Sequence, residues 1–73
     1  MRVLFVNNDG GGFADRIDID DGTTVADLFK QKLPDRQPED FLIRVNRQEV
    51  PADQVLQEGD RITMSPTKVA GAT

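Results

Sequence analysis

The sequence predicts a two-layer α+β domain, in which a mixed sheet carries a helix on one of its faces. Three observations support this fold class. The chain has 73 residues, which is the length of one small domain. One segment has helical periodicity, and the segments on both sides of it alternate between apolar and polar residues as strands do. Because one helix cannot cover both faces of a sheet, we expect the second face to be open.

The first two predicted strands form a hairpin. Residues 2–8 (RVLFVNN) are rich in β-branched and aromatic types and carry apolar side chains on both faces, which is typical of a central strand. Residues 9–12 (DGGG) interrupt this pattern. Residues 13–19 (FADRIDI) resume it, with Ile17 and Ile19 alternating against polar neighbours.

The predicted helix has the clearest local signals. Thr24 is a favourable N-cap, and Asp27 follows three residues later at the spacing of a capping box. Apolar residues recur at helical spacing, namely Val25, Leu28, Phe29 and Leu33. Pro34 ends the helix, because proline has no backbone N–H and its ring clashes with the preceding turn.

The remainder of the chain predicts three further strands. After a polar loop at residues 35–40, residues 41–46 alternate as a strand, and residues 46–50 indicate a tight turn into a short edge strand. Residues 53–56 are expected to form a single helical turn. Residues 61–65 alternate again and are expected to form the last strand.

The predicted element order is strand, strand, helix, strand, short strand, strand. With the first and last strands paired in the middle, this is a β-grasp (ubiquitin-like) arrangement with a four- to five-stranded mixed sheet. Residues 1–65 are expected to form the domain. Residues 66–73 (PTKVAGAT) are expected to form a flexible C-terminal tail, which Pro66 and Lys68 direct away from the sheet.

Composition excludes several classes of function. There are 9 basic and 13 acidic residues, a net charge of −4, and no cysteine or histidine. Disulfides, zinc sites and catalysis by Cys-His or Ser-His pairs are therefore excluded. An acidic balance with few aromatic residues disfavours nucleic-acid binding. No apolar run reaches membrane-spanning length, and the first residues do not have the pattern expected of a signal peptide, so we expect a cytoplasmic monomer without a membrane, metal or cofactor partner.

Two other patterns have weak functional interpretations. Residues 10–12 (GGG) follow a strand, but a phosphate-binding P-loop also needs a lysine and a helix at that point, so a hairpin turn is favoured. Asp15, Asp18, Asp20 and Asp21 form an acidic cluster. Because a loop that starts at Asp18 lacks the ligands of an EF-hand, the cluster is expected to be a solvated edge.

Four short motifs occur in order along the chain. A helix start at residues 22–28 (GTTVADL) and a hairpin at residues 45–50 (VNRQEV) come first. A turn at residues 56–62 (LQEGDRI) and a proline-containing tail at residues 65–71 (SPTKVAG) follow. Each motif resembles its counterpart in the MoaD and ThiS sulfur carriers of the ubiquitin-like β-grasp superfamily. The resemblance covers essentially the whole chain.

This resemblance implies a protein that is not an enzyme and that acts through its C-terminus. In the family, an adenylating enzyme of the ThiF, MoeB or ubiquitin-activating type uses ATP to convert the terminal glycine carboxylate into an acyl-adenylate. Sulfur carriers then become thiocarboxylates, and modifiers are transferred to an amine. The implied partners are the activating enzyme and, for a modifier, a C-terminal peptidase and a conjugating enzyme. Glycine suits such a tail, because a bare backbone enters a narrow channel.

The end of the chain departs from the family pattern. It ends Ala70-Gly71-Ala72-Thr73 and not in Gly-Gly, so activation or conjugation is expected at Gly71, Ala72 or Thr73. Three interpretations stay open: a peptidase removes Thr73, a peptidase removes Ala72 and Thr73, or the tail is not activated and the domain only binds. The extension favours a modifier. The alternatives are a MoaD/ThiS carrier for cofactor biosynthesis and a non-covalent ubiquitin-like interaction module.

The open face of the sheet is the expected docking surface for the activating enzyme. Strand alternation leaves an apolar patch rimmed by arginines there, which is typical of protein docking sites. On the first strand, alternation alone allows either Leu4 and Val6 or Val3 and Phe5 to face outward. The predicted partner-binding residues are Leu4, Val6, Leu42, Arg44, Arg61, Thr63, Pro66 and Lys68.

Overall fold

The computed structural model describes residues 1–8 and 12–67, in which five strands form one mixed sheet with the order β2-β1-β5-β3-β4. The elements are β1 (Arg2–Asn7), β2 (Phe13–Asp18), α1 (Val25–Lys32), the 3₁₀ helix η1 (Pro38–Asp40), β3 (Phe41–Val45), β4 (Gln48–Glu49) and β5 (Arg61–Pro66). β1 and β5 pair in parallel at the centre, and the other neighbouring strands pair antiparallel. The predicted α+β class and the central pairing of the first and last strands are confirmed.

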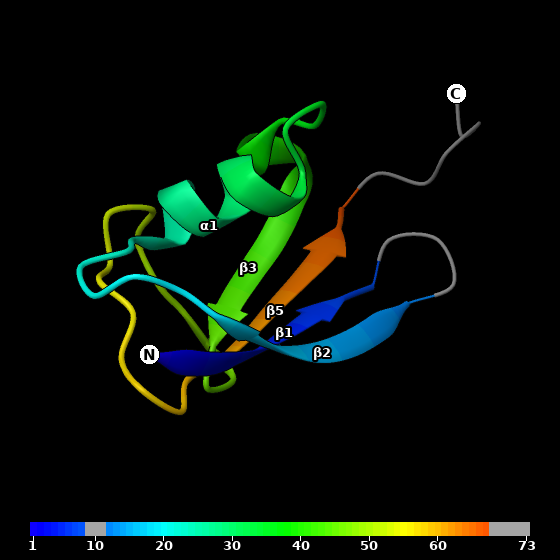
Figure 1. The fold of residues 1–73 in the computed structure, drawn as a ribbon. Coiled ribbons are helices and arrows are strands. Elements are labelled where there is room, and N and C mark those ends of the chain that lie inside the picture. Colours follow the sequence, from blue (N-terminus) through cyan, green and yellow to red (C-terminus); the bar gives the residue numbers. More distant parts are fainter. Residues whose placement is uncertain (9–11, 68–73) are drawn as a thin grey trace, which may run out of the picture.

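Figure 1 shows α1 lying across one face of the sheet. The apolar stripe of α1 meets the inward side chains of β1, β3 and β5 in one core. The core residues are Val3, Phe5, Ile19, Val25, Leu28, Phe29, Phe41, Val45, Leu56, Ile62 and Met64. Phe29 of α1 and Phe41 of β3 pack edge to face, with ring centroids 5.2 Å apart. The helix is therefore attached to the sheet by an interlocking aromatic contact as well as by apolar burial.

The start of α1 is stabilised by the predicted capping box. The backbone N–H of Asp27 donates to Thr24 Oγ1 at 3.1 Å, and the N–H of Thr24 donates to Asp27 Oδ2 at 3.2 Å. Two more free N–H groups of the first turn, on Val25 and Ala26, donate to the carbonyls of residues 54 and 52. All of these donors would otherwise lack a partner within the helix.

These last bonds explain why one local prediction was wrong. Residues 53–56 do not form a helical turn. The segment instead lies along the start of α1, with an isolated β-bridge between Thr24 and Val55 and a bond from the Leu56 N–H to the Thr23 carbonyl. The Gln54 carbonyl accepts from the helix start, and so does the Ala52 carbonyl just before the segment, so the segment follows α1 instead of forming a helix. The loop predicted at residues 35–40 contains η1, which begins at Pro38.

A tight turn joins β3 to β4 and also anchors the start of β5. Asn46 and Arg47 have φ values of 53° and 73°, as a two-residue type I′ hairpin turn requires. Asn46 Nδ2 donates to Asp60 Oδ1 at 2.9 Å, and Asn46 Oδ1 accepts from the N–H of Arg61 at 3.0 Å. Two of the sequence motifs, the hairpin and the Gly-Asp turn, are thus bonded to each other. The predicted edge strand is shorter than expected, because only residues 48–49 form β4.

β5 extends slightly further than the sequence indicated. It ends at Pro66, so the expected domain boundary between residues 65 and 66 falls inside a strand. The N–H and hydroxyl of Thr67 both donate to the Asp40 carbonyl, at 2.8 and 3.0 Å. The first two residues of the predicted tail are therefore attached to the sheet and to η1. Residues 68–73 lie outside the described part of the chain.

Candidate functional site

Alternation along β1 divides its side chains between two environments. Val3 and Phe5 are each 1% exposed beneath α1, whereas Leu4 and Val6 are half-buried on the opposite face. The sequence allowed either arrangement, and the structure places Leu4 and Val6 outward. We call the face away from α1 the open face.

Six of the eight predicted partner-binding residues lie on the open face. They are Leu4, Val6, Leu42, Arg44, Arg61 and Thr63. Val6, Thr63 and Arg44 are successive register partners across β1, β5 and β3, so they form one row across the sheet. The row is apolar at β1 and cationic at β3. It lies closer to the C-terminal end of β5 than Leu4 and Arg61 do.

The last two predicted residues are placed differently. Pro66 is the register partner of Phe41, whose side chain is in the core, so Pro66 lies on the helix side of the sheet. Lys68 lies outside the described residues, as do the predicted activation residues Gly71, Ala72 and Thr73. What the structure places is the base of the tail, where Thr67 is bonded to the Asp40 carbonyl.

An exposed aromatic side chain lies at the same end of the sheet as the tail. Phe13, at the start of β2, is 54% exposed and packs edge to face on Phe5, with ring centroids 5.9 Å apart. Asn8, just after β1, donates from Nδ2 to Ser65 Oγ of β5 at 2.9 Å. Because β1 and β5 are parallel, a partner that reaches the chain after β5 also meets this end of the first hairpin.

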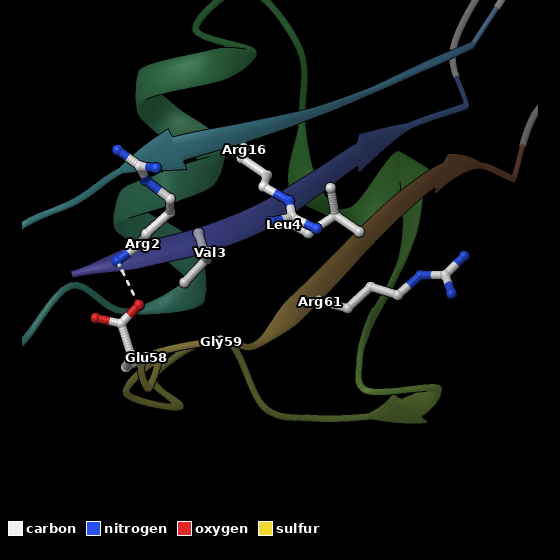
Figure 2. Close-up of a pocket in the computed structure, with 7 residues that line it drawn as sticks. All are labelled: Arg2, Val3, Leu4, Arg16, Glu58, Gly59 and Arg61. Carbon is white, nitrogen blue, oxygen red and sulfur yellow. Dashed lines mark hydrogen bonds between the residues drawn. The ribbon is translucent and has the colours of Figure 1, made fainter.

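The other end of the open face contains a hollow of about 330 Å³ (Figure 2). Its lining residues are Arg2, Val3, Leu4, Arg16, Glu58, Gly59 and Arg61, and we call it the Leu4 hollow. Leu4 is the register partner of Arg16 on β2 and of Arg61 on β5. Leu4 therefore lies between two arginines on three adjacent strands.

The turn before β5 is bonded directly to β1 and forms one wall of the hollow. Gly59 has a φ of +83°, which a residue with a side chain adopts only with strain, and its N–H donates to the Arg2 carbonyl at 2.9 Å. In return, the Arg2 N–H donates to Glu58 Oε2 at 3.0 Å. The wall is thus held to the first strand by two reciprocal bonds.

The arginines of the hollow differ in their partners. Arg2 Nε donates to Asp18 Oδ1 at 3.2 Å, and this hydrogen bond raises the pKa of the Arg2 guanidinium. Within residues 1–8 and 12–67, neither Arg16 nor Arg61 forms an ion pair. The Asp60 carboxylate beside Arg61 instead accepts from the Gln57 N–H at 2.8 Å and from Asn46 Nδ2. Two cationic groups therefore face solvent beside an apolar side chain.

Comparison with known proteins bears on the fold. The sequence matches no protein-family model, and the search of curated proteins gives no match. A solved structure of a ubiquitin-like protein from the hyperthermophilic archaea Caldiarchaeum subterraneum is similar with a TM-score of 0.70 and 14% sequence identity. The similarity covers 96% of this chain and 100% of that one. This chain has the ubiquitin-like β-grasp fold.

Some residues of the site in this ubiquitin-like fold were missed by the sequence analysis. Arg16, Arg2 and Phe13 were not among the predicted contacts. The face on which β2 presents Arg16 depends on the register of the first hairpin, which a glycine-rich turn of unspecified geometry does not determine. Val3 is buried beneath α1, so strand alternation puts its neighbours Arg2 and Leu4 together on the open face. The sequence could have shown this once the covered face was known.

Among the described residues, no three acidic, histidine or cysteine side chains are arranged to hold a metal ion. In the same part of the chain, no helix has the length and apolar character needed to cross a membrane.

Proposed function

We propose that this chain is a ubiquitin-like carrier or modifier and not an enzyme, and that the segment after β5 is activated by a partner enzyme. The observation that carries the proposal is the base of the tail. β5 is a central strand, and it leads directly into Thr67, which two hydrogen bonds hold to the Asp40 carbonyl. The next residues in the sequence, 68–73 (KVAGAT), are mostly small. A rigid sheet therefore leads into a segment with few bulky side chains.

The proposed chemistry belongs to the partner. A carboxylate oxygen at the end of the segment bonds to the α-phosphorus of ATP, the bond from that phosphorus to the β-phosphate oxygen breaks, and pyrophosphate leaves. An amine, or a sulfur nucleophile for a sulfur carrier, then attacks the acyl carbon, and AMP leaves. Glycine and alanine favour this reaction, because close approach of the backbone to ATP requires small side chains.

The activating enzyme is proposed to dock on the part of the open face nearest the tail. Val6, Leu42 and Thr63 are half-buried there, and Arg44 is exposed beside them. An apolar patch with a cationic rim is typical of a protein–protein interface. Phe13 is exposed at the same end of the sheet but lies on the helix side, because it packs on the core residue Phe5.

The test is an adenylation assay on three forms of the protein. These end at Thr73, Ala72 and Gly71, and each is incubated with Mg²⁺, ATP and an activating enzyme of the ThiF or ubiquitin-activating type. We expect ATP–pyrophosphate exchange, and an acyl-adenylate, thiocarboxylate or isopeptide product by mass spectrometry, from at least one form. A form that ends at Thr67 is the matched control, because it keeps the sheet and lacks the segment. Failure of all three longer forms would contradict the proposal.

A non-covalent interaction module is the second candidate. The Leu4 hollow favours it, because this feature lies at the end of the sheet opposite Thr67, away from the segment proposed to be activated. Under this alternative, deletion of residues 70–73 leaves partner binding and the activity of the complex unchanged. Under the first proposal, the same deletion abolishes the reaction.

A further inference from the structure

We infer that the Leu4 hollow is a second docking site, and that it binds an acidic protein segment which places an apolar side chain between two carboxylates. This site is separate from the tail and does not depend on its activation. Leu4 supplies the apolar floor, and Arg16 and Arg61 supply the two cationic sides. Figure 2 shows these side chains on the same part of the sheet, with Glu58 at the far wall.

The spacing of the groups fits such a segment. Neighbouring strands are about 4.8 Å apart, so the backbones of Arg16 and Arg61, two strands apart, are separated by roughly 10 Å. Alternate residues of an extended peptide are about 7 Å apart, so carboxylates that flank an apolar residue at alternate positions span roughly 13 Å. Long arginine side chains cover the difference. Arginine also suits carboxylates, because its planar group donates two parallel hydrogen bonds to them.

The distribution of charge supports an acidic partner. The chain has a net charge of −4, yet four of its six arginines, Arg2, Arg16, Arg44 and Arg61, lie on the open face. Of the three in the hollow, Arg2 already has Asp18 as a partner. Arg16 and Arg61 have no ion pair within residues 1–8 and 12–67, although acidic residues are abundant. Their positive charge is therefore available to a partner.

A polyanion such as RNA fits the hollow less well. The Glu58 carboxylate lies in the lining, and Asp18 lies beside Arg2, so a continuous line of phosphates would meet negative charge at both places. No aromatic side chain lines the hollow, so a base has nothing on which to stack. About 330 Å³ is also at the lower end of ligand-pocket volumes, which run from about 300 to 1,000 Å³.

The hollow and the tail lie at opposite ends of β5. This strand starts at Arg61, in the hollow, and ends at Pro66, next to the base of the tail. Five residue steps of about 3.3 Å separate the two ends by roughly 17 Å. A short segment bound in the hollow therefore does not cover Pro66 and Thr67, so we expect one molecule to hold an acidic partner while an activating enzyme binds at the other end of β5.

The experiment uses the full chain and a labelled peptide, Asp-Ser-Leu-Ser-Asp, with blocked ends. Its matched control is the uncharged peptide Asn-Ser-Leu-Ser-Asn. Fluorescence anisotropy measures binding, and backbone amide chemical shifts map it. We expect saturable binding of the acidic peptide with a dissociation constant below about 1 mM. The shift changes should fall on the strands around Leu4, Arg16 and Arg61 and leave Thr67 unaffected.

The protein variants separate a specific site from general attraction. The double variant Arg16→Gln/Arg61→Gln should bind the acidic peptide roughly tenfold more weakly. Arg47→Gln removes an exposed arginine in the β3–β4 turn, outside the hollow, and should change binding by less than about twofold. If the double variant fails to fold by circular dichroism, Arg16→Lys and Arg61→Lys replace it. Each should lose about threefold, because lysine cannot bind a carboxylate through two parallel bonds.

Several results would overturn the inference. These are the absence of saturation, equal binding of the uncharged peptide, or equal binding by the double variant and Arg47→Gln. Tighter binding of oligouridylate with the same dependence on Arg16 and Arg61 would assign the hollow to phosphate instead. Deletion of residues 68–73 should leave peptide binding unchanged, so a failure of this site and a failure of tail activation are distinguishable.

Discussion

Neighbouring residues of one strand lie in different environments on the two faces of the sheet. On β5, Ile62 and Met64 have no exposed surface beneath α1, whereas Thr63 between them is half-buried on the open face. β1 shows the same contrast between Phe5 and Leu4. Because successive side chains of a strand point to opposite faces, each strand supplies stability with one set of residues and a binding surface with the other. The surface can therefore change without cost to the core.

The largest effect should come from the covered face. Phe5→Ala should lower the free energy of unfolding by about 3–5 kcal/mol, because it removes a buried aromatic ring and leaves a cavity. Leu4→Ala, one residue away on the open face, should cost less than about 1.5 kcal/mol, since Leu4 is only partly buried. Urea unfolding followed by circular dichroism measures both, because the chain has no tryptophan or tyrosine. Equal losses of unfolding free energy in the two variants would contradict the proposed difference between the faces.

A second effect concerns the turn that holds the start of β5. Asn46→Ala should cost about 2 kcal/mol, because it loses the bonds to Asp60 and Arg61 and places alanine at a φ of 53°. Asn46→Gly keeps the backbone conformation accessible and should cost about 1 kcal/mol. Urea unfolding measures the loss of stability in both variants. An unchanged amide shift at Arg61 in either variant would count against this role of the turn.

Substitutions at the helix cap test how the start of α1 is stabilised. Thr24→Ala should destabilise the protein by about 1 kcal/mol, because the N–H of Asp27 loses its acceptor at the helix start. Thr24→Ser keeps the hydroxyl and is the matched control, with an expected change of less than about 0.5 kcal/mol. Thermal and urea unfolding measure the difference. Equal destabilisation by the two variants would show that the methyl group of Thr24, and not its hydroxyl, matters.

A substitution on the open face should have the smallest effect on stability and a large effect on docking of the activating enzyme. Thr63→Glu should change the free energy of unfolding by no more than about 0.5 kcal/mol. It should weaken docking of an activating enzyme at least about tenfold, because a charge enters the centre of the proposed interface. Gln31→Glu on the exposed side of α1 adds the same charge and should leave docking unchanged. Isothermal titration calorimetry compares them, and equal effects would exclude this surface.

Much of the fold follows from local signals. The capping box at Thr24 and Asp27 and the alternation of β3 depend on neighbouring residues, and these predictions were confirmed. Residues 53–56 were predicted to form a single helical turn. The structure shows residues 52–56 bonded to the start of α1 instead, since the free N–H groups of Val25 and Ala26 need acceptors. That requirement involves residues distant in sequence, so local propensity could not reveal it.

The binding surface was predicted only in part. Alternation identified Leu42, Arg44 and Thr63 as outward residues once the core strands were recognised. It left the direction of Leu4 undecided, because β1 is apolar on both faces, and it did not associate Arg16 with Leu4. Register across strands decides which side chains are neighbours, and register depends on turns and long-range pairing.

The sequence alone determined the five strands and the α-helix, their order and the class of fold, because hydrophobic periodicity and capping residues act over a few positions. Tertiary structure decided which face α1 covers, and hence that Leu4 lies outward between Arg16 and Arg61. It also decided that the start of β5 is held by Asn46 and the base of the tail by Asp40. These contacts join residues far apart in the chain, and they exist only after the sheet has formed.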